Sequence, residues 1–158
     1  MDERQTILLV DDSENDLALM REAFRKAGFT SPLQEVHSGE EAIAYLKGED
    51  PYRDRRRFPL PVVILLDLNM PLKNGFDVLS WLTTQPAFKH LSVIILTASG
   101  RSEDVERAFD LGASSYLVKP SNLGALTDMI RCLRDWLQIN HFPPLNEIVR
   151  RDRSPGLT

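Results

Sequence analysis

The sequence has only one cysteine, Cys132, among its 158 residues. One cysteine excludes an internal disulfide framework and a zinc site made of cysteines, and it favours a reducing cytoplasmic environment. No apolar run approaches the roughly 20 residues that a membrane-spanning helix needs, and the first residues lack the basic and then apolar order of a signal peptide. These absences predict a soluble, cytoplasmic protein without a membrane partner.

An excess of positive charge is absent as well. Lysine and arginine number 19 against 23 aspartates and glutamates, so the net charge is −4 and a nucleic-acid partner is not expected. A local exception is the arginine-rich stretch 49–61, with four basic and three acidic side chains. We interpret this stretch as a solvated loop, and a contact patch for an acidic partner is the alternative interpretation.

Long apolar segments are missing, but five short ones occur, at residues 7–10, 33–36, 62–66, 93–96 and 116–118. The first, third and fourth are continuous apolar runs rather than alternating patterns. Continuous runs of this length are typical of parallel strands that are covered on both faces.

Amphipathic segments that predict helices lie between these strands and after the last one. The first begins at the capping sequence that opens with Ser13 and ends at Gly28, and the second runs from Ser38 to Gly48. The other three are expected around residues 76–82, 102–111 and 126–137. In the fourth helix, Val105, Ala108 and Phe109 are expected to face the core.

The alternation of strand and helix, five times over, predicts an α/β protein with a doubly wound five-stranded parallel sheet. We expect a single domain over residues 5–138, with residues 49–61 as an insertion between the second helix and the third strand. Residues 139–158 are expected to form a C-terminal tail, without a separate output domain.

Polar side chains follow four of the five strands, at the edge where an open parallel sheet binds ligands. They are Asp11 and Asp12, Asp67, Thr97, and Lys119. Three converging carboxylates repel one another unless a cation joins them, and Mg²⁺ with oxygen ligands is the cation that fits best. Such a cleft, with a lysine and a hydroxyl, suits a phosphoryl group. Asp67 is the expected nucleophile, because its strand is the most apolar and therefore the expected centre of the sheet.

Four motifs, in order and spacing, resemble the signature of the response-regulator receiver domains of two-component signalling. The motifs are Val10-Asp11-Asp12, the run Leu66-Asp67-Leu68-Asn69-Met70-Pro71 with Asn74-Gly75, Thr97-Ala98, and Val118-Lys119-Pro120. The resemblance implies the flavodoxin-like (βα)5 fold of CheY-like receivers. It also implies a signalling module rather than an enzyme.

The resemblance implies that Asp67 accepts a phosphoryl group from a sensor histidine kinase. Mg²⁺ would be held by Asp11, Asp12, Asp67 and the backbone carbonyl of Asn69. Thr97, Ala98 and Lys119 would bind the phosphoryl group.

The remaining implied roles concern switching and the lifetime of the phosphorylated state. Thr97 and Tyr116 would change position together as the switch, and Asn69 and Ser99 would tune dephosphorylation. The bond between Lys119 and Pro120 is expected to be cis.

The run 65–71, the insertion and the ending 134–137 with its proline-bearing tail are similar to small stand-alone regulators paired with bacterial and cyanobacterial phytochrome kinases. This resemblance implies a phytochrome-type kinase partner and a homodimer joined through the fourth helix, fifth strand and fifth helix. Trp136, Phe142 and Leu145 would supply apolar contacts to the dimer. Intramolecular packing of these three over the end of the fifth helix is the alternative.

Two other functions remain open on the sequence. One is a dimeric adaptor that works without phosphorylation. The other is an Mg²⁺-dependent phosphatase with an aspartyl nucleophile, which needs an acid two residues after the nucleophile to protonate the leaving group. Asn69 stands at that position and cannot supply the proton.

Overall fold

The computed structural model describes residues 5–143, in which five strands and five α-helices alternate. The strands are β1 (Thr6–Val10), β2 (Leu33–Val36), β3 (Pro61–Leu66), β4 (Ser92–Thr97) and β5 (Ser115–Val118). The helices are α1 (Glu14–Lys26), α2 (Gly39–Lys47), α3 (Gly75–Thr83), α4 (Ser102–Asp110) and α5 (Leu123–Ile139), and a short 3-10 helix, η1 (Pro86–Phe88), follows α3. The predicted order of elements is confirmed, and η1 is the one element that the sequence patterns did not indicate.

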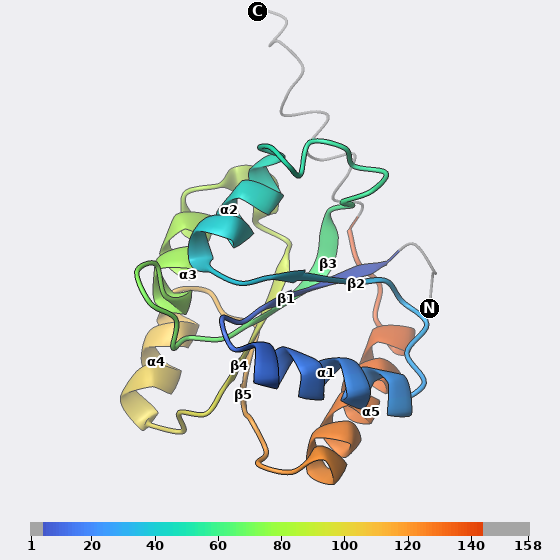
Figure 1. The fold of residues 1–158 in the computed structure, drawn as a ribbon. Coiled ribbons are helices and arrows are strands. Elements are labelled where there is room, and N and C mark those ends of the chain that lie inside the picture. Colours follow the sequence, from blue (N-terminus) through green and yellow to red (C-terminus); the bar gives the residue numbers. More distant parts are fainter. Residues whose placement is uncertain (1–4, 144–158) are drawn as a thin grey trace, which may run out of the picture.

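All strand pairs of the five-stranded sheet are parallel, and the strand order is β2-β1-β3-β4-β5 (Figure 1). Strand β3 therefore lies at the centre, as its apolar sequence predicted. The register pairs Val10 of β1 with Leu66 of β3, and Leu66 with Ile95 of β4. Because these pairs align the strand ends, the residues that follow β1, β3 and β4 leave the sheet at one common edge.

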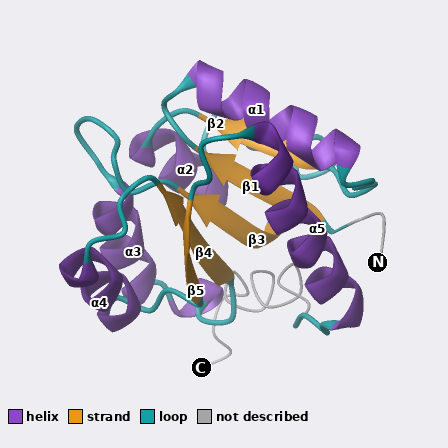
Figure 2. Ribbon diagram, turned by 90° about the horizontal axis from the view of Figure 1, so that it is seen from below, coloured by secondary structure: helices purple, strands orange, loops and turns teal. Residues whose placement is uncertain are grey.

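Helices cover both faces of the sheet, with α1 and α5 on one face and α2, α3 and α4 on the other (Figure 2). Alternate residues of each central strand enter opposite cores. Leu65 packs with α1 and α5, whereas Leu66 packs with the helices of the other face. This double coverage explains the continuous apolar runs and confirms the doubly wound fold.

Helix α4 departs from its predicted packing. Ala108 is fully buried, but Phe109 is 49% exposed and Val105 is only half-buried. Successive residues of a helix are about 100° apart around its axis, so a narrow contact centred on Ala108 leaves its neighbour in solvent. The inward position predicted for Phe109 is therefore wrong.

The insertion at residues 49–61 is only partly the solvated loop that we expected. Arg56 and Arg57 are exposed, but Arg55 folds back onto the end of α2. Its guanidinium donates hydrogen bonds to the carbonyl oxygens of Tyr45 at 2.7 Å and Leu46 at 2.8 Å. Because the last carbonyls of a helix have no partner within the helix, Arg55 acts as a C-terminal cap for α2.

We expect Arg55→Ala to lower the free energy of unfolding by about 1–2 kcal/mol, because it leaves carbonyl oxygens of α2 without these donors. Arg56→Ala is the matched control, because Arg56 is the next residue of the same loop and is exposed. It should change the free energy of unfolding by less than about 0.5 kcal/mol. Urea denaturation of both variants measures the difference. Equal midpoints for the two variants would contradict the capping role.

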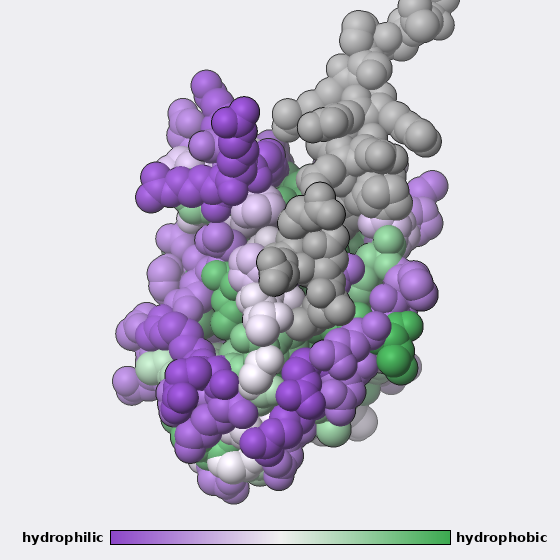
Figure 3. All heavy atoms as spheres, turned by 90° about the vertical axis from the view of Figure 1, so that its right-hand side faces the viewer, coloured by the Kyte–Doolittle hydropathy of each residue, from purple (hydrophilic) through white to green (hydrophobic). Residues whose placement is uncertain are grey.

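Apolar side chains reach the surface near the end of α5. Figure 3 shows the side of the molecule on which α5 lies in Figure 1, with neutral and hydrophobic atoms between hydrophilic margins. The rings of Trp136 and Phe142 meet edge to face with their centroids 5.9 Å apart, and Phe142 packs against the core beside α1 and α5. Phe142 thus packs within the chain, whereas Trp136 contacts it and still leaves 37% of its surface exposed. Leu145 lies outside the described residues. Over residues 5–143, no helix is both long and apolar enough to cross a membrane.

Candidate functional site

Three carboxylates gather at the edge of the sheet where the strands end. Asp11 and Asp12 follow β1 and Asp67 follows β3, and one carboxylate oxygen from each lies within 4.8 Å of the others. The side chains of Asp11 and Asp67 are only 7% and 9% exposed, whereas Asp12 is exposed. The structure thus brings together the three aspartates that the sequence predicted to converge.

Backbone N–H groups fix one oxygen of each buried carboxylate. The amide of Ser13 donates to Oδ1 of Asp11 at 2.9 Å, and the amide of Asn69 donates to Oδ1 of Asp67 at 3.2 Å. Burial raises the pKa of Asp11, although the hydrogen bonds from Lys119 and from Ser13 lower it in part. Both loops therefore hold their carboxylates toward one another.

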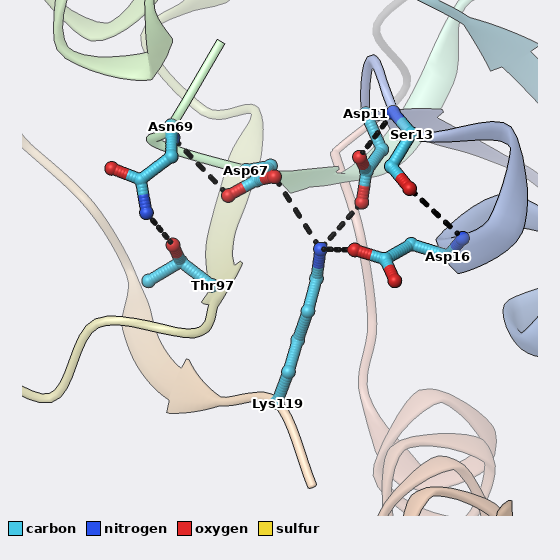
Figure 4. Close-up of polar contacts among 7 residues, drawn as sticks. All are labelled: Asp11, Ser13, Asp16, Asp67, Asn69, Thr97 and Lys119. Carbon is cyan, nitrogen blue, oxygen red and sulfur yellow. Dashed lines mark hydrogen bonds and ion pairs between the residues drawn. The ribbon is translucent and has the colours of Figure 1, made fainter. Parts of the chain in front are cut away.

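Lys119 crosses the site from the end of β5 and ends among the carboxylates (Figure 4). Its Nζ atom lies 2.5 Å from Oδ2 of Asp11, 3.0 Å from Oδ2 of Asp16 and 3.4 Å from Oδ2 of Asp67. Burial lowers the pKa of Lys119, but the hydrogen bonds and charges of these carboxylates outweigh burial and raise it overall. Lys119 is therefore a positively charged ammonium throughout the neutral pH range.

Asp16 is the site residue that the sequence reasoning missed. It lies in the first turn of α1, where its amide donates to Oγ of Ser13 at 3.2 Å, as the capping pattern predicts. Its carboxylate is also a partner of Lys119. The position of Asp16 shortly after β1 indicates that it belongs to the site. The first turn of a helix that follows a strand lies at the edge of the sheet where that strand ends.

Thr97 and Asn69 meet on the other side of Asp67. Thr97 ends β4 and is fully buried, and its Oγ1 accepts a hydrogen bond from the side-chain amide of Asn69 at 3.2 Å. Ala98, the next residue, is exposed and adds no bulk at the entrance. The hydroxyl predicted to meet a phosphoryl group is thus linked to Asp67 through the hydrogen bonds of Asn69.

Tyr116 and Ser99 form a separate network on the loop between β4 and α4. The Tyr116 hydroxyl donates to the carbonyl oxygen of Ser99 at 2.8 Å, and the Ser99 hydroxyl donates to Asp104 of α4 at 2.6 Å. Burial raises the pKa of Tyr116, with the Ser99 hydrogen bond opposing it. The predicted switch tyrosine is therefore tied to the segment that links Thr97 to α4.

The peptide bond between Lys119 and Pro120 is not cis, contrary to our expectation. Among the residues that the structure describes, the cis bond is the one between Asp50 and Pro51. A trans bond before proline is favoured by about 0.5–1 kcal/mol, and the trans chain already delivers the Lys119 ammonium to the carboxylates. The site therefore forms without the cis bond.

The donor set fits a hard divalent cation. Three carboxylates share a space a few ångströms across, and two of them are nearly buried, so their mutual repulsion raises the energy of the site. The single ammonium of Lys119 offsets only part of that negative charge. Oxygen ligands in this arrangement favour Mg²⁺ or a similar ion over the softer metals that prefer thiolates.

A family model described as response regulator receiver domain matches residues 7–131. The response regulator Rcp1 of Synechocystis is 34% identical over 140 residues, which are 88% of this chain and 93% of Rcp1. Its Mn²⁺-bound crystal structure superimposes with a TM-score of 0.77, covering 88% of this chain and 99% of Rcp1's.

Two other crystal structures are also similar over most of their length. The phosphorylated cyanobacterial phytochrome response regulator RcpA is 32% identical with a TM-score of 0.80, covering 89% of this chain and 99% of RcpA. A response regulator in red light signalling of R. palustris is 33% identical with a TM-score of 0.83. The match covers 88% of this chain and 98% of that regulator. The family match over residues 7–131 includes the stretch of chain that carries the acidic residues.

Proposed function

Because the chain belongs to the response regulator receiver domain family, we propose that Asp67 accepts a phosphoryl group from a sensor histidine kinase. The observation that carries the proposal is the position of Asp67. It lies at the end of the central strand, with Asp11, Asp12 and Lys119 around it. In this proposal the phosphorylated chain signals through changed binding of a protein partner.

In the transfer, a carboxylate oxygen of Asp67 attacks the phosphorus of the donor. A P–O bond forms, the P–N bond to the kinase histidine breaks, and the electron pair leaves with the imidazole nitrogen. The Lys119 ammonium lies 3.4 Å from Oδ2 of Asp67, close enough to pair with an oxygen of the arriving group. The product is an aspartyl phosphate, and no further acid is needed at the acceptor.

Asp11, Asp12 and Asp67, with the backbone carbonyl of Asn69, would hold Mg²⁺ beside the acceptor. When bound, the ion offsets the negative charge of the carboxylates and of the phosphoryl oxygens. The proximity of the three carboxylates supports this assignment, as does the Mn²⁺-bound state of Rcp1.

The proposed switch begins at Thr97. The Thr97 hydroxyl accepts from the Asn69 amide and keeps its own proton, which it would donate to a phosphoryl oxygen by moving toward Asp67. Tyr116 would then move into the space that Thr97 leaves, and its bond to Ser99 couples this movement to α4. Asn69 and Ser99 would set the access of water to the phosphoryl group, and with it the rate of dephosphorylation.

The phytochrome regulators among the similar structures support a phytochrome-type kinase as the partner. A homodimer through α4, β5 and α5 is part of the same proposal. Phe109, Val118 and Trp136 leave apolar surface on these three elements, with exposures of 49%, 46% and 37%. Sedimentation with and without a phosphoryl analogue tests the dimer.

The proposed function predicts Mg²⁺-dependent phosphorylation of this chain. Incubated with Mg²⁺ and a small phosphodonor such as acetyl phosphate, the protein should gain one phosphoryl group, which hydroxylamine should remove because an acyl phosphate is electrophilic. EDTA should prevent the labelling, because the carboxylates then repel the donor. Intact-protein mass spectrometry measures the result. Labelling that resists hydroxylamine would contradict the proposal, and sustained release of phosphate from monoesters would favour the phosphatase instead.

A further inference from the structure

The ammonium of Lys119 contacts one acidic group, Asp16, that is not among the three aspartates assigned to the metal. Oδ2 of Asp16 lies 3.0 Å from Nζ of Lys119, whereas Oδ2 of Asp67 lies 3.4 Å away. In Figure 4, Asp16 and Asp67 approach Nζ from opposite sides. Asp11 and Asp16 therefore hold the ammonium nearer to the α1 side of the site than to Asp67.

An ammonium group has three N–H donors and no acceptor. In this structure three carboxylates surround Nζ, so each donor already has a partner. A phosphoryl group on Asp67 presents additional oxygens, and pairing with them requires Lys119 to weaken one of these contacts.

Asp16 is the partner that Lys119 can release at the smallest cost. Its side chain is 42% exposed, compared with 7% for Asp11 and 9% for Asp67. A carboxylate at that exposure is hydrated by water when its partner leaves. A buried carboxylate would instead keep a negative charge without water or a cation to compensate it.

We propose that Asp16 is a positioning residue that competes with the phosphoryl group for Lys119. It acts through the lysine and not on the phosphorus, and the inference rests on the proposed function of Asp67. Its consequence is that Asp16 sets how readily the unphosphorylated site accepts the phosphoryl group.

The chain offers a matched control in the same turn of α1. Glu14 is two residues earlier and also acidic, but its carboxylate pairs with Arg21 at 2.6 Å. Asp16→Asn and Glu14→Gln therefore remove the same charge from the start of the same helix. Only the first variant removes a carboxylate that contacts Lys119.

The test is a calorimetric titration with beryllium fluoride, a phosphoryl analogue, at saturating Mg²⁺. Asp16→Asn should bind the analogue about two- to fivefold more tightly than the unmodified protein, the range expected for a partly exposed ion pair. Glu14→Gln should bind it with unchanged affinity. Circular dichroism melting of both variants checks that each is folded.

Asp16→Asn is then repeated in a Lys119→Met background. The increase in affinity for beryllium fluoride should disappear in that background, because Asp16 acts through the lysine. Unchanged or weaker binding by Asp16→Asn with Lys119 present would overturn the inference, and so would an equal gain in the Lys119→Met background. If the unmodified protein binds no beryllium fluoride with Mg²⁺, it is the proposed function that fails.

Discussion

Asp67→Asn is expected to abolish phosphoryl transfer to this chain, with a loss on the order of 1,000-fold or more in the labelling rate. The substitution replaces the attacking carboxylate oxygen by an amide, which is a poor nucleophile, while the shape of the side chain is almost unchanged. Mass spectrometry after incubation with acetyl phosphate or kinase and Mg²⁺ measures the loss.

The control is Asp110→Asn, an exposed aspartate in the last turn of α4. It removes the same charge away from the site and should be labelled at the unmodified rate. Hydroxylamine-sensitive labelling of Asp67→Asn at the unmodified rate would show that another residue is the acceptor. The neighbouring Asp11 and Asp12 are then the first candidates, because both share the pocket.

Gly75→Ala is expected to destabilise the fold by about 1–3 kcal/mol and to weaken Mg²⁺ binding. A Cβ atom at this position would lie 2.5 Å from the carbonyl oxygen of Asp67 and 2.9 Å from Cα of Leu68. Both are backbone atoms, so the loop that carries Asp67 would have to move. Urea denaturation measures the stability, and calorimetry measures the Mg²⁺ affinity.

Gly124→Ala is the matched control, because Gly124 also lies in the first turn of a helix. The nearest atom to its added Cβ would be Oδ1 of Asn122 at 3.4 Å, which can adjust. Alanine favours a helix over glycine by up to about 1 kcal/mol, so this variant should be at least as stable as the unmodified protein. Equal Mg²⁺ affinities for Gly75→Ala and Gly124→Ala would contradict the packing argument.

The elements of the fold were predictable because their signals are local. Ser13 and Ser38 accept hydrogen bonds from the amides of Asp16 and Glu41, as the capping patterns predicted. Gly48 ends α2 in the left-handed conformation at φ 72°, which glycine adopts without strain. The central strands have continuous apolar runs because both of their faces are buried. Because the strands are parallel, their carboxyl ends lie at one edge of the sheet.

The errors concern contacts between distant segments. Phe109 has the hydrophobicity of a core residue, but the placement of α4 against the sheet leaves it exposed. Arg55 has the sequence context of a solvated loop, and only the return of that loop to α2 gives its guanidinium carbonyl partners.

The sequence by itself determined the (βα)5 order, the central position of β3 and the set of residues at the sheet edge, because periodicity, capping and strand ends are encoded within short windows. Only the tertiary structure decided how the charges pair within that edge. Lys119 and Asp16 are 103 positions apart in the chain, and their contact at 3.0 Å depends on the packing of α1 against the sheet that contains β5. Ion pairing requires distances of a few ångströms, and those distances exist only after the whole sheet is assembled.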